Sequence, residues 1–126
     1  MVPTELRYTT DHEWVRLDGD SATIGITDFA ARQLGDVVFV DLPAGGTQVS
    51  QFGTFGVVES VKAVSDLFAP VSGEVTATND QLTGQPELVN SDPFGAGWMI
   101  QIRVSHPGQL DGLLDADAYD RLIAEG

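Results

Sequence analysis

The chain contains a single lysine, Lys62, and its position makes it a candidate for covalent modification. Within residues 56–75, two runs with the composition of β-strands flank a short tip at 60–63. A hairpin tip exposes its side chains on a rigid support, so an amino group there is open to a modifying enzyme. Most lysines at turns are merely solvated. The assignment therefore depends on the neighbours of Lys62.

The expected tip lacks the residues that two-residue hairpin turns favour. Such turns usually contain glycine or asparagine, whereas the central residues here are Val61 and Lys62, which have no special tolerance for positive φ. A type I turn from Ser60 to Ala63 is one way to accommodate them. A turn that departs from the usual turn chemistry indicates a functional constraint.

The remaining sequence reads as short strands, because 14 glycines and 6 prolines interrupt apolar, β-branched runs. Strands are expected at 13–17 and 21–27, joined by a turn that contains Gly19. The run 36–42 is apolar enough to be buried on both faces, and 98–104 alternates like a final strand. The sequence therefore predicts a mainly β fold.

Two helices are also expected. A short helix near residues 28–34 has Thr27 or Asp28 as its N-cap and Gly35 as its C-cap. A C-terminal helix is expected over about residues 111–125, where apolar side chains recur with helical spacing at Leu113, Leu114, Ala118, Leu122 and Ile123.

Composition limits the class of partner. The 126 residues, 42% of them apolar, suit one domain spanning residues 1–126. A net charge of -13 argues against nucleic acid and anionic membranes as partners. Without a secretory signal or a segment long enough to span a bilayer, we expect a bacterial cytoplasmic protein, or a mitochondrial matrix protein only if a presequence has been removed.

The sequence offers no catalytic or metal-binding motif. It has no cysteine, and its two histidines, His12 and His106, lack metal-ligand spacing. A G-x-S-x-G nucleophile motif is also absent. A catalytic triad whose residues lie far apart in the sequence remains an alternative. An independent enzyme is therefore disfavoured, and we expect no catalytic residues and no metal.

The residues around Lys62 resemble one family of carriers. The segments 59–63, 65–66 and 69–75 resemble the lipoyl-attachment region of glycine cleavage system H proteins, and the resemblance extends to 12–15, 22–28, 34–43 and 88–99. Biotin carriers typically place methionine on both sides of the lysine, and lipoyl domains of 2-oxoacid dehydrogenases usually have Asp-Lys-Ala. Neither pattern fits Val61-Lys62-Ala63 as well.

This resemblance implies a lipoyl/biotinyl-type flattened β-sandwich, or barrel-sandwich hybrid, with its lipoyl-binding core at about residues 21–104. It implies one (R)-lipoate per chain, attached to Lys62 as N6-lipoyllysine. A lipoate ligase or a lipoyl/octanoyl transferase would attach it, and the residues expected to support the turn or its recognition are Glu59, Ser60, Val61, Ala63 and Gly73.

The resemblance also implies a role in glycine catabolism and one-carbon metabolism. The lipoyl arm would take the methylamine group of glycine from the pyridoxal-phosphate-dependent P protein to the T protein, an aminomethyltransferase, and the L protein, dihydrolipoyl dehydrogenase, would reoxidise it. Glu13 and Asp66 are candidate carboxylates for a cleft that shelters the loaded arm. A lipoyl relay or storage protein that donates lipoate to other complexes is the alternative.

Overall fold

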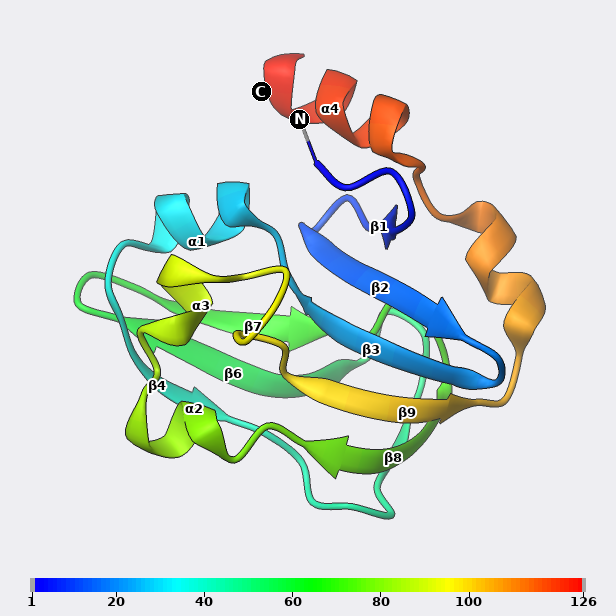
Figure 1. Cartoon of the computed structure of the whole chain (residues 1–126), viewed down its shortest axis with the longest axis horizontal. Coiled ribbons are helices and arrows are strands. Elements are labelled where there is room, and N and C mark those ends of the chain that lie inside the picture. Colours follow the sequence, from blue (N-terminus) through cyan, green and yellow to red (C-terminus); the bar gives the residue numbers. More distant parts are fainter. Residues whose placement is uncertain (1, 126) are drawn as a thin grey trace.

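The computed structural model describes residues 2–125 and consists mainly of β-strands (Figure 1). Within these residues, the strands form two antiparallel sheets. The larger sheet has the order β1-β2-β3-β9-β8-β5, with β1 (Arg7–Tyr8), β2 (Glu13–Asp18), β3 (Ser21–Ile26), β9 (Ile100–Val104), β8 (Gly73–Thr78) and β5 (Gln48–Val49). The smaller sheet has the order β4-β6-β7, with β4 (Val37–Asp41), β6 (Thr54–Ser60) and β7 (Val64–Phe68).

The two sheets share one hydrophobic core. Its fully buried side chains come from the larger sheet, including Ile24, Ile100 and Ile102, and from the smaller sheet, including Val58 and Leu67. Ile24 lies opposite Ile100 in the register of β3 and β9, so their side chains point to the same face. The sheets therefore pack as a sandwich, and the predicted fold is confirmed.

The first hairpin and the first helix follow their expected boundaries. Gly19 turns between β2 and β3 with φ of 64°. Helix α1 (Asp28–Leu34) begins after Thr27, whose hydroxyl accepts a hydrogen bond from the Ala30 amide, and ends at Gly35, with φ of 81°. Two short helices, α2 (Gln81–Gly84) and α3 (Leu88–Ser91), precede β9.

The expectation that the run 36–42 is buried on both faces is wrong. Val37 is buried, but Val38 and Phe39 each expose 51% of their surface. Strand β4 is an edge strand of a sheet that covers the core with one face only, and a bulge interrupts its register between Val37 and Phe39. A continuous apolar run therefore does not separate an edge strand from a central one.

The C-terminal helix starts later than predicted. Residues Pro107–Gly112 form a 3-10 helix, and α4 spans Ala116–Glu125. Between them, Leu114 exchanges backbone hydrogen bonds with Tyr8, both 2.8 Å long, which requires extended backbone at that point. The apolar pattern that predicted one helix from residue 111 therefore spans the end of a 3-10 helix, an extended segment and a separate α-helix. In the described part of the chain, no helix is long and apolar enough to cross a membrane.

Candidate functional site

Lys62 lies at the tip of the β6–β7 hairpin, as predicted. Val61, Lys62 and Ala63 are all exposed, and Val61 exposes 69% of its surface. Strand β6 pairs with both β4 and β7, so the tip projects from a three-stranded sheet rather than from an isolated loop. The amino group is thus accessible while its backbone is fixed.

Ser60 shapes this tip with its side chain. Its hydroxyl accepts hydrogen bonds from the amides of Lys62 at 3.2 Å and Ala63 at 3.1 Å, and its own amide donates to the Ala63 carbonyl at 2.8 Å. The Val61 amide donates to the Asp36 carbonyl at 3.0 Å, which ties the tip to the chain entering β4. Val61 and Lys62 adopt no positive φ, because the non-glycine residues with positive φ in residues 2–125 are His12 and Phe52.

The side chain of Lys62 passes beside the end of α1. A Cβ added to Gly35 would lie 3.4 Å from Lys62 Cε, an ordinary van der Waals distance, so the space beside the lysine does not require glycine, whereas the φ of 81° at this helix end favours it. Asn90 in α3 fixes this junction, since its Nδ2 donates to the Gly35 carbonyl at 2.8 Å and its Oδ1 accepts from the Val37 amide at 2.9 Å. The sequence indicated Gly35 only as a helix cap, and no local pattern singled out Asn90.

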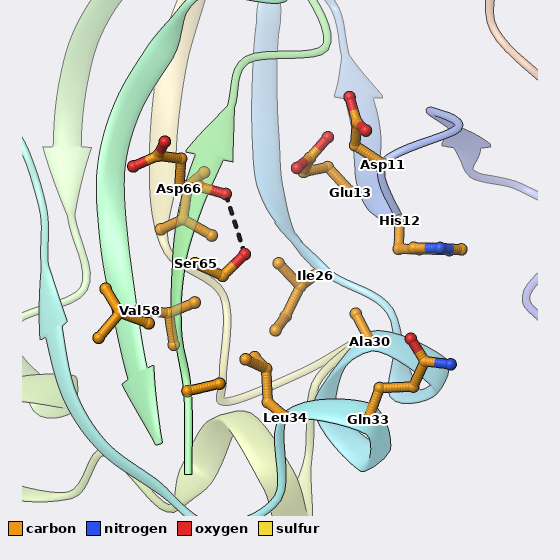
Figure 2. A pocket seen from close by; sticks show the side chains of 13 residues that line it. Asp11, His12, Glu13, Ile26, Ala30, Gln33, Leu34, Val58, Ser65 and Asp66 are labelled. Atoms are coloured by element: carbon orange, nitrogen blue, oxygen red, sulfur yellow. Dashed lines mark hydrogen bonds between the residues drawn. The ribbon is translucent and has the colours of Figure 1, made fainter. Parts of the chain in front are cut away.

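A cleft of about 320 Å³ runs beside the hairpin (Figure 2). Strand β7 forms one wall and α1 the other, and Glu13 lies at the end of the cleft remote from the tip. Its apolar surface and its polar end come from Asp11, His12, Glu13, Ile26, Ala30, Gln33, Leu34, Val58, Ala63, Val64, Ser65, Asp66 and Leu67. The cleft suits a flexible chain with an apolar stem and a cationic head.

Glu13 is almost completely buried, with 2% of its surface exposed. Its Oε1 accepts a hydrogen bond from the Thr9 hydroxyl at 2.6 Å, and its Oε2 accepts one from the Phe68 amide at 3.3 Å. Burial raises the pKa of Glu13 to about 7 despite these bonds, because the charged form loses its hydration. A cation entering the cleft would favour the carboxylate form and pair with it.

The carboxylate of Asp66 points away from the cleft in Figure 2, although Asp66 lies along its wall. Asp66 pairs with Val57 across the hairpin, whereas its neighbour Ser65 pairs with the buried Val58, so the two side chains leave opposite faces. The backbone carbonyl of Asp66 accepts a hydrogen bond from the Ser65 hydroxyl at 3.4 Å. The geometry favours Glu13 over Asp66 as the cleft carboxylate.

The five residues expected to support the turn or its recognition fall into two places. Ser60, Val61 and Ala63 surround Lys62, and half-buried Glu59 precedes them in β6. Gly73 instead starts β8 in the larger sheet, where an added Cβ would lie 2.2 Å from the Arg103 carbonyl oxygen. Its lack of a side chain therefore lets β8 approach β9 closely.

Together, a two-sheet sandwich and an exposed lysine on a hairpin tip define a carrier domain of the lipoyl/biotinyl type. The family model for the glycine cleavage H-protein matches residues 6–126. The chain belongs to the glycine cleavage H-protein family.

Individual relatives agree with this assignment over nearly the whole chain. The glycine cleavage system H protein of Carboxydothermus hydrogenoformans is 50% identical over 125 residues, covering 99% of this chain and 96% of the relative. That of Magnetococcus marinus is 59% identical over 118 residues, covering 94% and 84%. A crystal structure of the Mycobacterium marinum H protein has a TM-score of 0.90 and 38% identity, covering 98% of this chain and 99% of that one.

The buried Glu13 predicts a pH dependence of stability. Because its pKa is raised from 4.5 to about 7, folding binds a proton, and the free energy of unfolding falls as pH rises between these values. The loss attributable to Glu13 is about 3 kcal/mol. Denaturant unfolding at pH 4.5 and pH 8 should therefore show Glu13→Gln gaining stability relative to the parent chain by about this amount at the higher pH.

Asp66→Asn is the matched control, since it removes the exposed carboxylate on the neighbouring wall. It should follow the parent chain at both pH values. A constant stability difference between Glu13→Gln and the parent across this range would contradict the assignment of a raised pKa to Glu13.

Proposed function

We propose that this chain is a covalent carrier that holds one (R)-lipoate in amide linkage to the side-chain nitrogen of Lys62. In this role it takes the methylamine group of glycine from the P protein to the T protein, and the L protein reoxidises its arm. The observation that carries the proposal is the placement of the exposed Lys62 beside a cleft that ends in the buried carboxyl group of Glu13.

Family membership supports the choice of lipoate, and the residues present fit that group. The lipoyl group supplies a dithiolane whose sulfur can carry the methylamine and can afterwards be reoxidised. Lys62 would tether the arm, and its stem passes beside Gly35 at the end of α1. The cleft offers apolar side chains from both walls and its floor, among them Ile26, Leu34 and Val58. These side chains would cover the stem of the arm and exclude water from its end.

Glu13 is the residue proposed to hold the amine of the cargo. Its carboxyl group is kept in place by Thr9 and by the Phe68 amide, so little reorganisation is needed when a cation arrives. Because burial makes the unpaired carboxylate unfavourable, an ammonium group would restore the charged form. The cleft would then retain the loaded arm until the T protein withdraws it. Asp66 is the less favoured candidate for this role, because its carboxylate points away from the cleft.

The enzyme that attaches lipoate is a further proposed partner. A lipoate ligase or a lipoyl/octanoyl transferase would modify Lys62, and the net charge of -13 favours enzyme surfaces that carry basic residues. The chain itself is proposed to contribute no catalytic residue, because the reactive atoms belong to the arm and to the partner enzymes. The two bacterial relatives support a cytoplasmic location in a bacterium.

Reconstitution tests this function directly. The lipoylated chain, mixed with P, T and L proteins, tetrahydrofolate, NAD and glycine, should form NADH in a glycine-dependent reaction. Lys62→Arg keeps the positive charge but cannot form the amide, so it should give no NADH while folding normally. A lipoylated, folded chain that gives no glycine-dependent NADH would overturn the glycine cleavage role and leave the lipoyl relay as the better function.

Recognition of the tip can be tested at Glu59. This residue lies three positions before Lys62 and pairs with Phe39 on one side and Val64 on the other, both of them exposed. We expect Glu59→Ala to lower the rate of lipoylation by a purified ligase about tenfold, the effect of losing one charge-assisted contact. Glu74→Ala, on β8 of the other sheet, is the control and should be modified at the parental rate. Equal rates for both variants would refute recognition through Glu59.

A further inference from the structure

The hydroxyl group of Tyr119 connects the C-terminal helix to the cleft. Tyr119 lies in α4 and is completely buried, with its ring stacked on Tyr8 at a centroid distance of 4.7 Å and an angle of 17°. Its hydroxyl oxygen lies 2.7 Å from Thr27 Oγ1 and 2.8 Å from His12 Nδ1. Tyr119 thus packs with one group of side chains and hydrogen-bonds another.

Counting donors and acceptors assigns a direction to this chain of bonds. Thr27 Oγ1 already accepts from the Ala30 amide at 3.2 Å, so its own proton can go to the Tyr119 oxygen. Tyr119 then donates to Nδ1 of a neutral His12 that carries its proton on Nε2. Burial lowers the pKa of His12, against the opposing charge of Asp11, which agrees with a neutral imidazole. The hydroxyls of Thr27 and Tyr119 then each donate one hydrogen bond and accept one.

The two residues that hydrogen-bond the Tyr119 hydroxyl, Thr27 and His12, each belong to a segment that forms part of the cleft. Thr27 is the N-cap of α1, and α1 supplies one cleft wall and ends at Gly35 beside Lys62. His12 directly precedes Glu13, lines the cleft, and has φ of 72°. Its carbonyl also accepts a hydrogen bond from the Thr27 amide at 2.9 Å. Left-handed backbone is unfavourable for histidine and persists only where the surroundings hold it.

We propose that Tyr119 is a positioning residue for the arm: through its hydroxyl, α4 fixes the N-terminus of α1 against the His12–Glu13 segment and so sets the width of the cleft. The stacking on Tyr8 needs only the ring of Tyr119, because phenylalanine would stack there equally well. The hydroxyl adds the connection to the cleft. This inference rests on the proposed function, since it concerns the cleft that is to shelter the lipoyl arm.

Tyr119→Phe tests the proposal, and Tyr8→Phe is a closely matched control. Both variants lose one hydroxyl from the same aromatic stack, but the Tyr8 hydroxyl donates to the Pro3 carbonyl at 2.5 Å and not to the cleft. In the chain without lipoate, Tyr119→Phe should speed hydrogen exchange of the Ala30 and Ala31 amides about fivefold, as expected for the loss of one buried hydrogen bond. It should also raise the pH at which the His12 imidazole titrates by NMR, because its neutral form loses a donor.

The lipoylated chains give a third measurement. After loading by the P protein and glycine, intact mass spectrometry follows how long the methylamine cargo stays on the arm without T protein. Tyr119→Phe should lose the cargo several-fold faster than the parent chain and Tyr8→Phe, with the folded fraction of each variant checked by thermal unfolding.

The outcomes separate the two claims. Equal exchange and equal His12 titration in the two variants would overturn the role of Tyr119, and so would faster exchange with unchanged retention of the cargo. If the unsubstituted chain itself accepts neither lipoate nor cargo, the proposed function fails and this inference fails with it. If the unsubstituted chain is loaded normally and Tyr119→Phe matches the control, only the inference fails.

Discussion

The buried carboxyl group of Glu13 is the constraint on which the site depends. Taking an ionisable group out of water costs free energy, and two hydrogen bonds offset only part of it, so the pKa rises to about 7. The bond from the Phe68 amide also joins the start of β2 to the end of β7, where the larger sheet meets the edge of the smaller one. The chain thus keeps an energetically costly group at one end of a cleft whose other end lies beside Lys62.

The rest of the fold holds the two ends of this cleft apart. The sandwich core supports β6 and β7, and the bond from Val61 to Asp36 anchors their tip. Helix α1 forms the opposite wall, with Asn90 bound at its C-terminal end and Tyr119 at its N-terminal end. The short helix α3 and the C-terminal helix α4 therefore act on one element, although they are far apart in the sequence. A rigid support around a mobile arm is what a carrier requires.

The sequence predicted the features that depend on local signals. The hairpin at Gly19, the caps of α1, and a tip at Lys62 follow from turn and capping chemistry within a few residues. The wrong expectations concern features that depend on contacts between distant segments. The apolar run 36–42 forms an edge strand, and the helix expected from residue 111 is interrupted where Leu114 pairs with Tyr8. The contact between His12 and Tyr119 joins residues 107 positions apart, which no local pattern reveals. The orientation of Asp66 could have been predicted from the sequence. Side chains alternate along a strand, so Asp66 points to the face opposite to that of its apolar neighbour Leu67, which is buried.

The central claim is that Lys62 carries the lipoyl group. Its most direct test is the intact mass of the chain after expression with lipoate and an active ligase, followed by peptide mapping. We predict a mass increase of one lipoyl group, located on the peptide that contains Lys62 and absent from Lys62→Arg. An unmodified mass in the presence of a ligase that modifies a known acceptor, or a modification located elsewhere, would contradict it.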